Sequence, residues 1–410
     1  MASMAVGADH PALAWAASGG MWLTGWADEA PVAPDAPVLA RAGGTGRELA
    51  QLTAELGTGV DVDPAELLFG RAALLGLERN GRTSPGASCR LIRAVDGWAA
   101  VTLARDDDIE AVPAITGIRD SEDPWRALET FAGTTTATSV AERAQLVGVP
   151  AAVLGASAVS EVGDPVRELP IGSPGATSGK APVVVDLSSL WAGPLCSHLL
   201  GQAGAHVIKV ESAHRPDGAR GGNPSFWAWL HGHDREAVVV DFRSAAGRAE
   251  LRTIVERADV VIEASRPRAL RQLGLVAEEV VAATPGKVWV SITGYGRDDT
   301  AAERVAFGDD AAVAGGLVAW DASGAPVFCG DAIADPLTGL CAAVGVARAL
   351  VRGGGVLLEV AMADVSACFA APSGSFPEAD VARADGGWEV RVDGARQPVL
   401  PPRPPAVGVT

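Results

Sequence analysis

Basic residues are scarce in this sequence, with 33 Lys and Arg against 50 Asp and Glu, and lysine is nearly absent. The formal net charge of −17 argues against a nucleic-acid partner, because phosphate backbones are bound by basic surfaces. A basic pocket within an acidic protein remains compatible with this charge. An anionic cofactor would require such a pocket.

Paired cysteines are also missing. The five cysteines are odd in number and widely spaced, with no C-x-x-C pair. This pattern fits neither a disulfide framework nor a zinc site, and it suits a reducing compartment. No segment has about 18 uninterrupted apolar residues, and the N-terminus lacks a basic region followed by an apolar run. We therefore expect a soluble cytoplasmic protein with no membrane partner.

The length of 410 residues, 48% of them hydrophobic, allows two or three domains. From Pro182 onward, short β-branched runs alternate with segments of helical periodicity. The expected strands are 183–187, 206–210, 237–241, 259–263, 287–292 and 356–360. The expected helices between them are 191–202, 244–257 and 277–283. This alternation predicts an α/β fold with a doubly wound, Rossmann-like parallel sheet and right-handed crossovers.

Ligands of such sheets bind at the carboxyl ends of the strands. The loops expected there are 188–194, 211–222, 265–268 and 293–299. The first of them lacks G-x-G-x-x-G, which argues against an ordinary dinucleotide site. Glu211, at the end of the second strand, has two interpretations: a ribose-binding acid or a solvated strand end.

The remaining chain has a different character. Residues 1–155 are predicted to contain a smaller α+β domain, with a strand at 98–103 and helices at 123–131 and 139–147. Residues 156–180 are rich in Gly, Pro and Ser and are predicted to be a linker. The Rossmann-like domain is assigned to 181–375. The Pro-rich end, 376–410, is predicted to be an extended arm.

Several short motifs in this order resemble one known family. They are 186–188 Asp-Leu-Ser, 192–194 Ala-Gly-Pro, 204–211 Gly-Ala-His-Val-Ile-Lys-Val-Glu, 259–263 Asp-Val-Val-Ile-Glu with Arg266-Pro267, 273–275 Leu-Gly-Leu, 291–296 Ser-Ile-Thr-Gly-Tyr-Gly, Asp335 with Gly339-Leu340, and Gly353–Gly355. In sequence and spacing the stretch is similar to the family III (CaiB/BaiF-type) CoA-transferases, a group that includes formyl-CoA transferases and α-methylacyl-CoA racemases. The resemblance implies a CoA-binding sheet domain.

The order of the parts departs from that family, in which the sheet domain precedes the small domain. Here the segment that resembles the small domain, 96–151, comes first. Residues 15–25 also resemble residues 311–320, each being a small-residue helix that leads into a Gly-Gly pair and an apolar strand. We interpret residues 10–155 as the later part of one family copy and 180–375 as the earlier part of a second. The N-terminal part would then supply the small domain.

The resemblance implies an aspartate nucleophile that attacks an acyl-CoA thioester and forms an acyl anhydride. A gapless alignment of the closing glycines places Gly308 at that position, followed at once by Asp309 and Asp310. A small shift in register makes either aspartate the nucleophile. Adjacent acids at a helix start can also simply cap the helix.

CoA carries several phosphate charges, so the resemblance also implies cations at the strand ends. The candidates are Arg215, Arg220, Arg235 and Arg266. Members of the family usually carry a more basic stretch where this chain reads His231-Gly-His-Asp-Arg235. The thinner basic loop puts the CoA-binding mode in question.

The expected substrates are an acyl-CoA and a carboxylic acid acceptor, with no metal or redox cofactor. The resemblance implies a homodimer. A second interpretation is an acyl-CoA racemase, which needs an Asp and a His as acid and base; no histidine follows His233. A third is a degenerate family member that binds CoA esters without catalysis, an interpretation kept open by Gly308.

Overall fold

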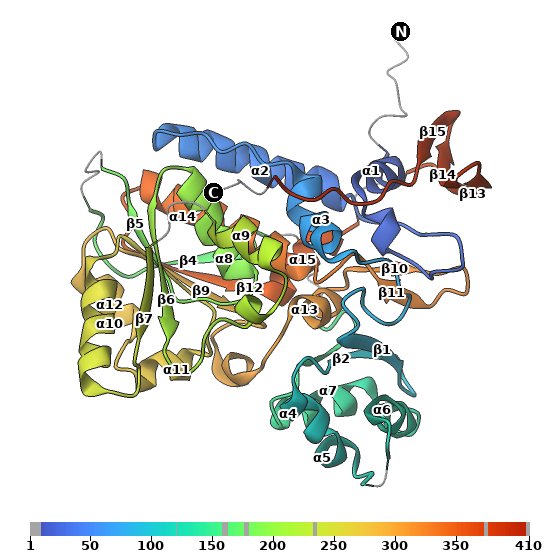
Figure 1. The fold of residues 1–410 in the computed structure, drawn as a ribbon, viewed down its shortest axis with the longest axis horizontal. Helices are drawn as coiled ribbons and strands as arrows, with labels where there is room; N and C mark the ends of the chain where they lie inside the picture. Colours follow the sequence, from blue (N-terminus) through green and yellow to red (C-terminus); the bar gives the residue numbers. More distant parts are fainter. Residues whose placement is uncertain are drawn as a thin grey trace.

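A computed structural model describes residues 10–119, 121–157, 163–175, 180–232, 236–372 and 376–406. Its centre is a seven-stranded sheet in the order β4-β12-β9-β8-β5-β6-β7 (Figure 1). The strands are β4 (Val166–Pro170), β5 (Val183–Asp186), β6 (His206–Ser212), β7 (Glu236–Val240), β8 (Val260–Glu263), β9 (Val288–Thr293) and β12 (Val356–Ala361). Each pairing is parallel except that of β4 with β12. The predicted doubly wound α/β fold is confirmed.

The central strands are buried on both faces, as their continuous β-branched sequences require. Val184 and Val260 point into one core, whereas Val185, Val261 and Trp289 point into another on the opposite face. This alternation follows from the two-residue side-chain period of a strand. The sheet therefore needs a helical layer on each side.

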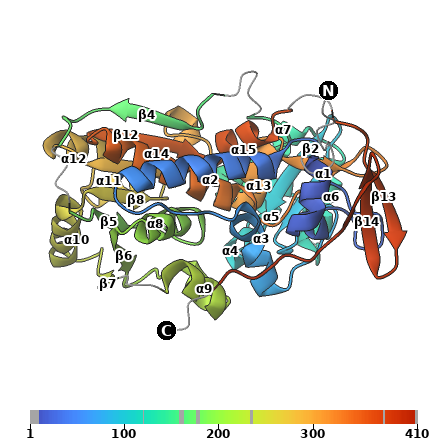
Figure 2. The same ribbon diagram turned by 90° about the horizontal axis from the view of Figure 1, so that it is seen from above.

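The first layer consists of α8 (Ala192–Gln202) and α14 (Ala334–Val351), and α2 (Val38–Glu55) packs outside α14 (Figure 2). The second layer contains α10 (Ala245–Arg257), α11 (Pro267–Gln272) and α12 (Ala277–Ala283), whose apolar residues join the opposite core. The remaining helices of this region are α9 (Pro224–His231) and α15 (Met362–Ala370), with short 3₁₀ turns η2 (Gly218–Gly221) and η3 (Asp299–Glu303).

Among the described residues, α14 alone is long and apolar enough to cross a membrane. However, 78% of its apolar window is buried inside the protein. Leu337, Leu340 and Ala343 pack against α8 and the sheet. Its apolar composition is that of a central core helix.

The first three helices belong to the large core and not to the small domain. Besides α2, they are α1 (Pro11–Ser18) and α3 (Pro64–Leu75). Trp15, Leu49 and Phe69 share one buried cluster with Leu195 of α8 and Leu340 of α14. The first half of predicted domain 1–155 therefore packs on the sheet domain, because its apolar helix faces are buried there.

A smaller α+β domain follows, as predicted. Its antiparallel sheet contains β1 (Cys89–Arg93), β2 (Trp98–Thr102) and β3 (Ala151–Val153). Its helices are α4 (Asp106–Glu110), α5 (Val112–Thr116), α6 (Pro124–Ala132) and α7 (Ala137–Leu146). They enclose a separate core around Leu128 and Val140, at the lower right of Figure 1.

Two segments predicted to be irregular contain strands. Within the predicted linker 156–180, β4 pairs antiparallel with β12 and covers one edge of the large sheet. Within the predicted arm 376–410, β13 (Asp380–Ala384), β14 (Gly387–Val392) and β15 (Ala395–Pro398) form an antiparallel sheet. Buried Val390 and Val392 join the core beside α1, which explains why this part is ordered.

The predicted repeat is only partly present. α1 and α13 (Gly308–Ala314) are both helices that precede a Gly-Gly pair. After the second pair, β10 (Val318–Trp320) pairs with β11 (Pro326–Phe328). After the first, Met21–Leu23 forms the 3₁₀ turn η1, so the predicted strand is wrong there. The Thr24 hydroxyl donates to the Gly20 carbonyl at 2.8 Å and closes this turn.

Candidate functional site

The strand order places a switch point at β5. The chain passes from β5 to β6 and β7 on one side, and then returns to β8 on the other. Ligands of doubly wound sheets bind beyond the carboxyl ends of strands at such a point. The relevant loops here are the one after β5, which leads into α8, and those after β6 and β8.

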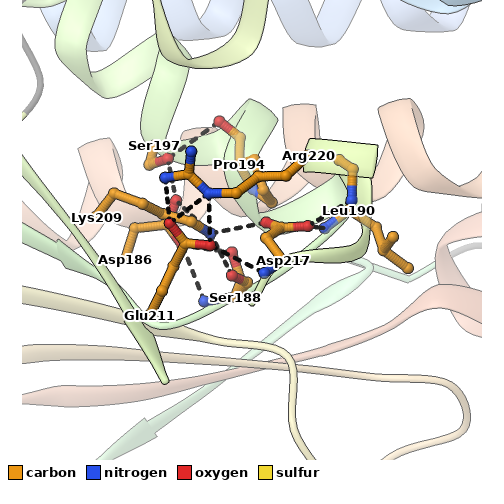
Figure 3. A network of polar contacts seen from close by, with 10 residues as sticks. Asp186, Ser188, Leu190, Pro194, Ser197, Lys209, Glu211, Asp217 and Arg220 are labelled. Carbon is orange, nitrogen blue, oxygen red and sulfur yellow. Dashed lines mark hydrogen bonds and ion pairs between the residues drawn. The ribbon is translucent and has the colours of Figure 1, made fainter. Parts of the chain in front are cut away.

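A buried lysine joins the first two of these loops (Figure 3). Lys209 Nζ lies 3.0 Å from Asp217 Oδ2 and 3.9 Å from Asp186 Oδ2, and it donates to the Ser188 carbonyl. All three charged side chains are at most 3% exposed. Asp217 Oδ1 accepts a hydrogen bond from the Leu190 backbone N–H at 2.9 Å. Leu190 has a φ of +70°, so the loop holds a strained backbone conformation.

Glu211 and Arg220, both predicted to contact the ligand, are bound to each other. The Arg220 guanidinium donates to both Glu211 oxygens, with Nε at 2.9 Å from each. Glu211 also accepts the Asp217 N–H at 2.9 Å, and Arg220 stacks over Trp227. Burial opposes ionisation of Glu211, but the hydrogen bonds from Arg220 and Asp217 lower its pKa overall.

The other predicted cations are differently placed. Arg215 lies three residues beyond β6, and Arg266 lies three residues beyond β8; both are exposed. Because β6 and β8 are the two neighbours of β5, these two residues lie on the loops on either side of the loop after β5. Arg235 lies outside the described residues.

Asp309 and Asp310 lie at the start of α13, which contacts the small domain, α14 and α15. Asp309 Oδ1 accepts the Ala332 N–H at 2.8 Å, and the Ser84 hydroxyl lies near this carboxylate. Burial, together with the charge of Asp331, raises the pKa of Asp309 to about 7. Asp309 keeps 7% of its surface exposed, whereas Asp310 keeps none.

Asp310 has the contacts of a helix cap. Its Oδ1 accepts the Phe307 N–H at 2.9 Å and the Thr102 hydroxyl at 3.0 Å. Its Oδ2 is buried without a hydrogen-bond partner among the described residues. Burial raises the pKa of Asp310 to about 7. The neighbouring Tyr295 comes from the Thr-Gly-Tyr-Gly loop predicted at the strand ends, and its hydroxyl donates to the Ala151 carbonyl at 3.3 Å.

Gly308 cannot be replaced by a larger residue without movement of its neighbours. A Cβ atom at this position would lie 2.2 Å from Asp335 Oδ2 and 2.3 Å from the Ala332 carbonyl oxygen. The Asp335 carboxylate therefore fills the space of a side chain at 308. The position at which the gapless alignment expects the nucleophile is closed in this chain.

Sequence reasoning missed the cation of this site. Arg71 on α3 forms an ion pair with Asp331 at 2.5 Å, and its guanidinium lies over the rings of Trp191 and Phe226, 5.4 and 5.6 Å from their centroids. A single arginine in the otherwise apolar run 67–75 was the available signal. Asp331 is a second residue of this site that the sequence did not reveal. It is 1% exposed, and its Oδ1 has no hydrogen-bond partner among the described residues.

These contacts join the acids around α13 to the loop after β5. The backbone N–H of Ala192, the first residue of α8, lies near the Asp335 carboxyl. Arg71 meanwhile contacts Trp191, the preceding residue. Burial raises the pKa of Asp335 to about 7, although the Arg71 charge opposes this rise. Asp335 and Arg71 thus link the acids around α13 to Ala192 and Trp191, at the end of the loop after β5.

The histidines that a racemase would need are engaged elsewhere. His206 Nε2 lies 3.4 Å from Glu236, and His214 Nε2 lies 3.1 Å from Asp241. The His231 ring stacks on Trp227 with 3.9 Å between centroids. His233 lies outside the described residues.

Comparison with known proteins finds CoA-transferases among the proteins similar to this chain. Similar proteins include the succinyl-CoA–D-citramalate CoA-transferase of Chloroflexus aurantiacus, 31% identical over 41% of this chain and 44% of that protein, and the succinate–glutarate CoA-transferase of Agrobacterium fabrum, 30% identical over 44% and 50%. A CaiB/BaiF family protein from Brucella suis is a structural neighbour with a TM-score of 0.45 and 26% identity, covering 53% of this chain and 66% of that one.

The chain thus matches only about half the length of these curated relatives. The sequence profile of CoA-transferase family III, in contrast, matches residues 182–403, more than half of this chain. The matched region begins one residue before β5 and includes α13, Asp331 and Asp335. The chain belongs to CoA-transferase family III.

Proposed function

We propose that this protein transfers CoA between carboxylic acids, with Asp309 as the nucleophile. The carrying observation is that Asp309 lies at the buried start of α13 beside Asp331 and Arg71, and that Arg71 reaches Trp191 at the end of the loop after β5. Asp309 is buried but keeps 7% of its surface exposed, and it is bound by the Ala332 N–H from outside its own helix. Asp310 is fully buried and caps α13.

In the proposed reaction, an Asp309 carboxylate oxygen attacks the thioester carbonyl carbon, the C–S bond breaks, and CoA leaves as a thiolate. The thiolate then attacks the aspartyl carbonyl of the anhydride, which frees the donor acid and leaves an aspartyl-CoA thioester. The acceptor carboxylate completes the exchange by the reverse steps. The Ala332 N–H holds the attacking carboxylate in place.

For CoA, we propose that Arg215 and Arg266 contact phosphates from the two sides of the loop after β5. Both are exposed at carboxyl strand ends. Arg220 is bound to Glu211 and orients the loop after β6. We expect Arg215→Ala and Arg266→Ala each to weaken CoA binding about tenfold in calorimetric titrations, with Arg47→Ala on α2 as the control. Unchanged affinity in both variants would contradict this site.

Trapping tests the nucleophile. The protein is incubated with a panel of acyl-CoAs and free acids, and hydroxylamine at neutral pH converts an enzyme anhydride into an acyl hydroxamate. We expect the hydroxamate to disappear in Asp309→Asn and to persist in Asp310→Asn. Loss in Asp310→Asn alone would assign the nucleophile to Asp310. Absence from the unsubstituted protein across the panel, with CoA still bound, would replace transfer by the non-catalytic CoA-ester-binding alternative.

The acyl-CoA racemase is the weaker alternative, because described histidines are bound to partners such as Glu236 and Asp241. Solvent deuterium entering the α-carbon without CoA exchange would favour it.

We also propose a cytoplasmic homodimer. All five cysteines are free, in keeping with a reducing compartment. The alpha and beta subunit names of the succinyl-CoA–L-malate CoA-transferase of Chloroflexus aurantiacus point to other assemblies in that relative. Light scattering after gel filtration measures the mass directly.

A further inference from the structure

The part of the chain before the family match contributes directly to the site. α3 lies more than a hundred residues before the matched region, 182–403. Asp63 caps its N-terminus by accepting the Ala65 N–H at 2.8 Å, and Leu68 and Phe69 are fully buried in the large core. Its other end is held by Asn223, whose side-chain amide donates to the Leu74 carbonyl at 3.0 Å. α3 therefore presents Arg71 from a fixed helix.

Arg71 lies between two parts of the proposed site. On one side its guanidinium forms the 2.5 Å ion pair with Asp331, and on the other it covers the rings of Trp191 and Phe226. Its side chain is 26% exposed, whereas that of Asp331 is 1% exposed. A charge pair shielded from water in this way interacts more strongly than a pair at the surface.

The charges around Asp309 are unbalanced. Burial and the charge of Asp331 raise the pKa of Asp309, and the Arg71 charge opposes this rise. Ionisable groups that face Asp309 from the surrounding elements are Asp331 of the loop before α14, Asp335 of α14, Asp310 of α13 itself and Cys89 of β1. The acids among them oppose ionisation of Asp309, and Cys89 stays a neutral thiol because burial raises its pKa well above the usual range. Asp309 is also bound by the Ala332 N–H, so the ion pair of Arg71 with Asp331 fixes the residue next to that donor.

We propose that Arg71 is a positioning residue: it holds Asp331 and Trp191 in place, and through Asp331 it fixes the neighbouring Ala332 N–H that binds the Asp309 carboxylate. The N-terminal segment then completes the catalytic site of the matched domain within one chain. This inference rests on the proposed function for its catalytic consequence. The effect of Arg71 on the titration of Asp309 can be measured without turnover.

Three variants test the proposal. Arg71→Met removes the charge, Arg71→Lys keeps it, and Arg71→Met with Asp331→Asn removes both members of the ion pair so that no buried charge is left unpaired. We expect hydroxamate formation at neutral pH to fall about tenfold or more in Arg71→Met, and its rise with pH to move upward by about one pH unit. Arg71→Lys should keep most of the rate of hydroxamate formation, and this rate should rise over the same pH range as in the unsubstituted protein. Arg47→Met on α2 is the matched control for loss of an arginine.

A second measurement separates this inference from the proposed function. Protein labelled with ¹³C at the aspartate carboxyl carbons is titrated by NMR, and Asp309→Asn identifies the Asp309 signal. We expect Asp309 to titrate at higher pH in Arg71→Met and to return toward lower pH in the double variant, which also removes the Asp331 charge that opposes ionisation of Asp309, whether or not hydroxamate forms. An unchanged Asp309 titration in folded Arg71→Met overturns the role of Arg71. Absence of hydroxamate in the unsubstituted protein refutes only the proposed transfer.

Discussion

At the start of α13, Asp309, Asp331 and Asp335 surround one guanidinium group, and Gly308 has no space for a side chain. The carboxylate of Asp335 lies where a Cβ of residue 308 would be. The missing side chain at 308 and the presence of Asp335 are therefore linked by packing. Two consequences of this arrangement are measurable on single residues.

Gly308→Ala should destabilise the protein. Its new methyl group would approach the Asp335 carboxylate and the Ala332 carbonyl to less than contact distance, so α13 or α14 must shift. We expect a loss of about 1–3 kcal/mol in the free energy of unfolding, measured in urea. Gly117→Ala serves as the control for loss of a glycine, although its φ of +77° adds strain without a clash. Equal stability of Gly308→Ala and the unsubstituted protein would show that the start of α13 is loosely packed.

Asp310→Asn should change how stability depends on pH. Burial raises the pKa of folded Asp310 to about 7 from a usual value of 3.8, so the folded protein retains a proton that the unfolded chain loses above about pH 4. Asp310 consequently lowers stability as pH rises from about 4 to 7, by at most about 4 kcal/mol. The asparagine keeps the oxygen that accepts from Thr102 and Phe307 but cannot ionise.

We therefore expect this variant to lose less stability than the unsubstituted protein between these pH values, measured by urea unfolding across the range. Parallel pH curves for the two proteins would contradict a raised pKa of Asp310.

At the scale of elements, the loops after β5 and β6 are held together by Lys209 (Figure 3). Lys209→Met keeps an apolar stem but leaves Asp186 and Asp217 buried without their cation. We expect a loss of about 3–5 kcal/mol in unfolding free energy and weaker CoA binding, because Lys209 no longer holds Ser188 and Asp217, which fix the loop at Leu190. Arg215→Met, an exposed cation on the neighbouring loop, is the stability control and should change it by less than about 0.5 kcal/mol. A Lys209→Met protein as stable as this control would refute the stabilising role of the buried ion pairs of Lys209 with Asp186 and Asp217.

At the scale of the whole molecule, residues 180–406 are not expected to fold alone. α1, α2 and α3 contribute Trp15, Leu49 and Phe69 to the core that contains α8 and α14. Without them, one face of α14 is exposed to water. We expect this fragment to aggregate, or the backbone amides of α14 to exchange hydrogen faster in it than in the full chain. A fragment of residues 82–157, in contrast, should keep its own core around Leu128 and Val140. Native-like exchange protection of α14 in the 180–406 fragment would contradict this prediction.

The sequence by itself determined the elements that depend on local pattern. The β-branched runs at β5, β6 and β8 and the periodic helices between them predicted the parallel sheet, because burial on both faces requires continuous apolar strands. The short motifs were enough for the family resemblance. Asp309 and Asp310 were identifiable because two acids follow directly on the expected nucleophile position.

Tertiary structure alone decided which side chains meet. Arg71 and Asp331 are 260 residues apart in sequence and form an ion pair because α3 packs against α14 and α9. Nothing local marks Glu211 as the partner of Arg220, β4 as a sheet edge, or α1–α3 as part of the large core. Such pairings arise from long-range burial of apolar faces, and a local sequence pattern carries no information about which distant face will cover them.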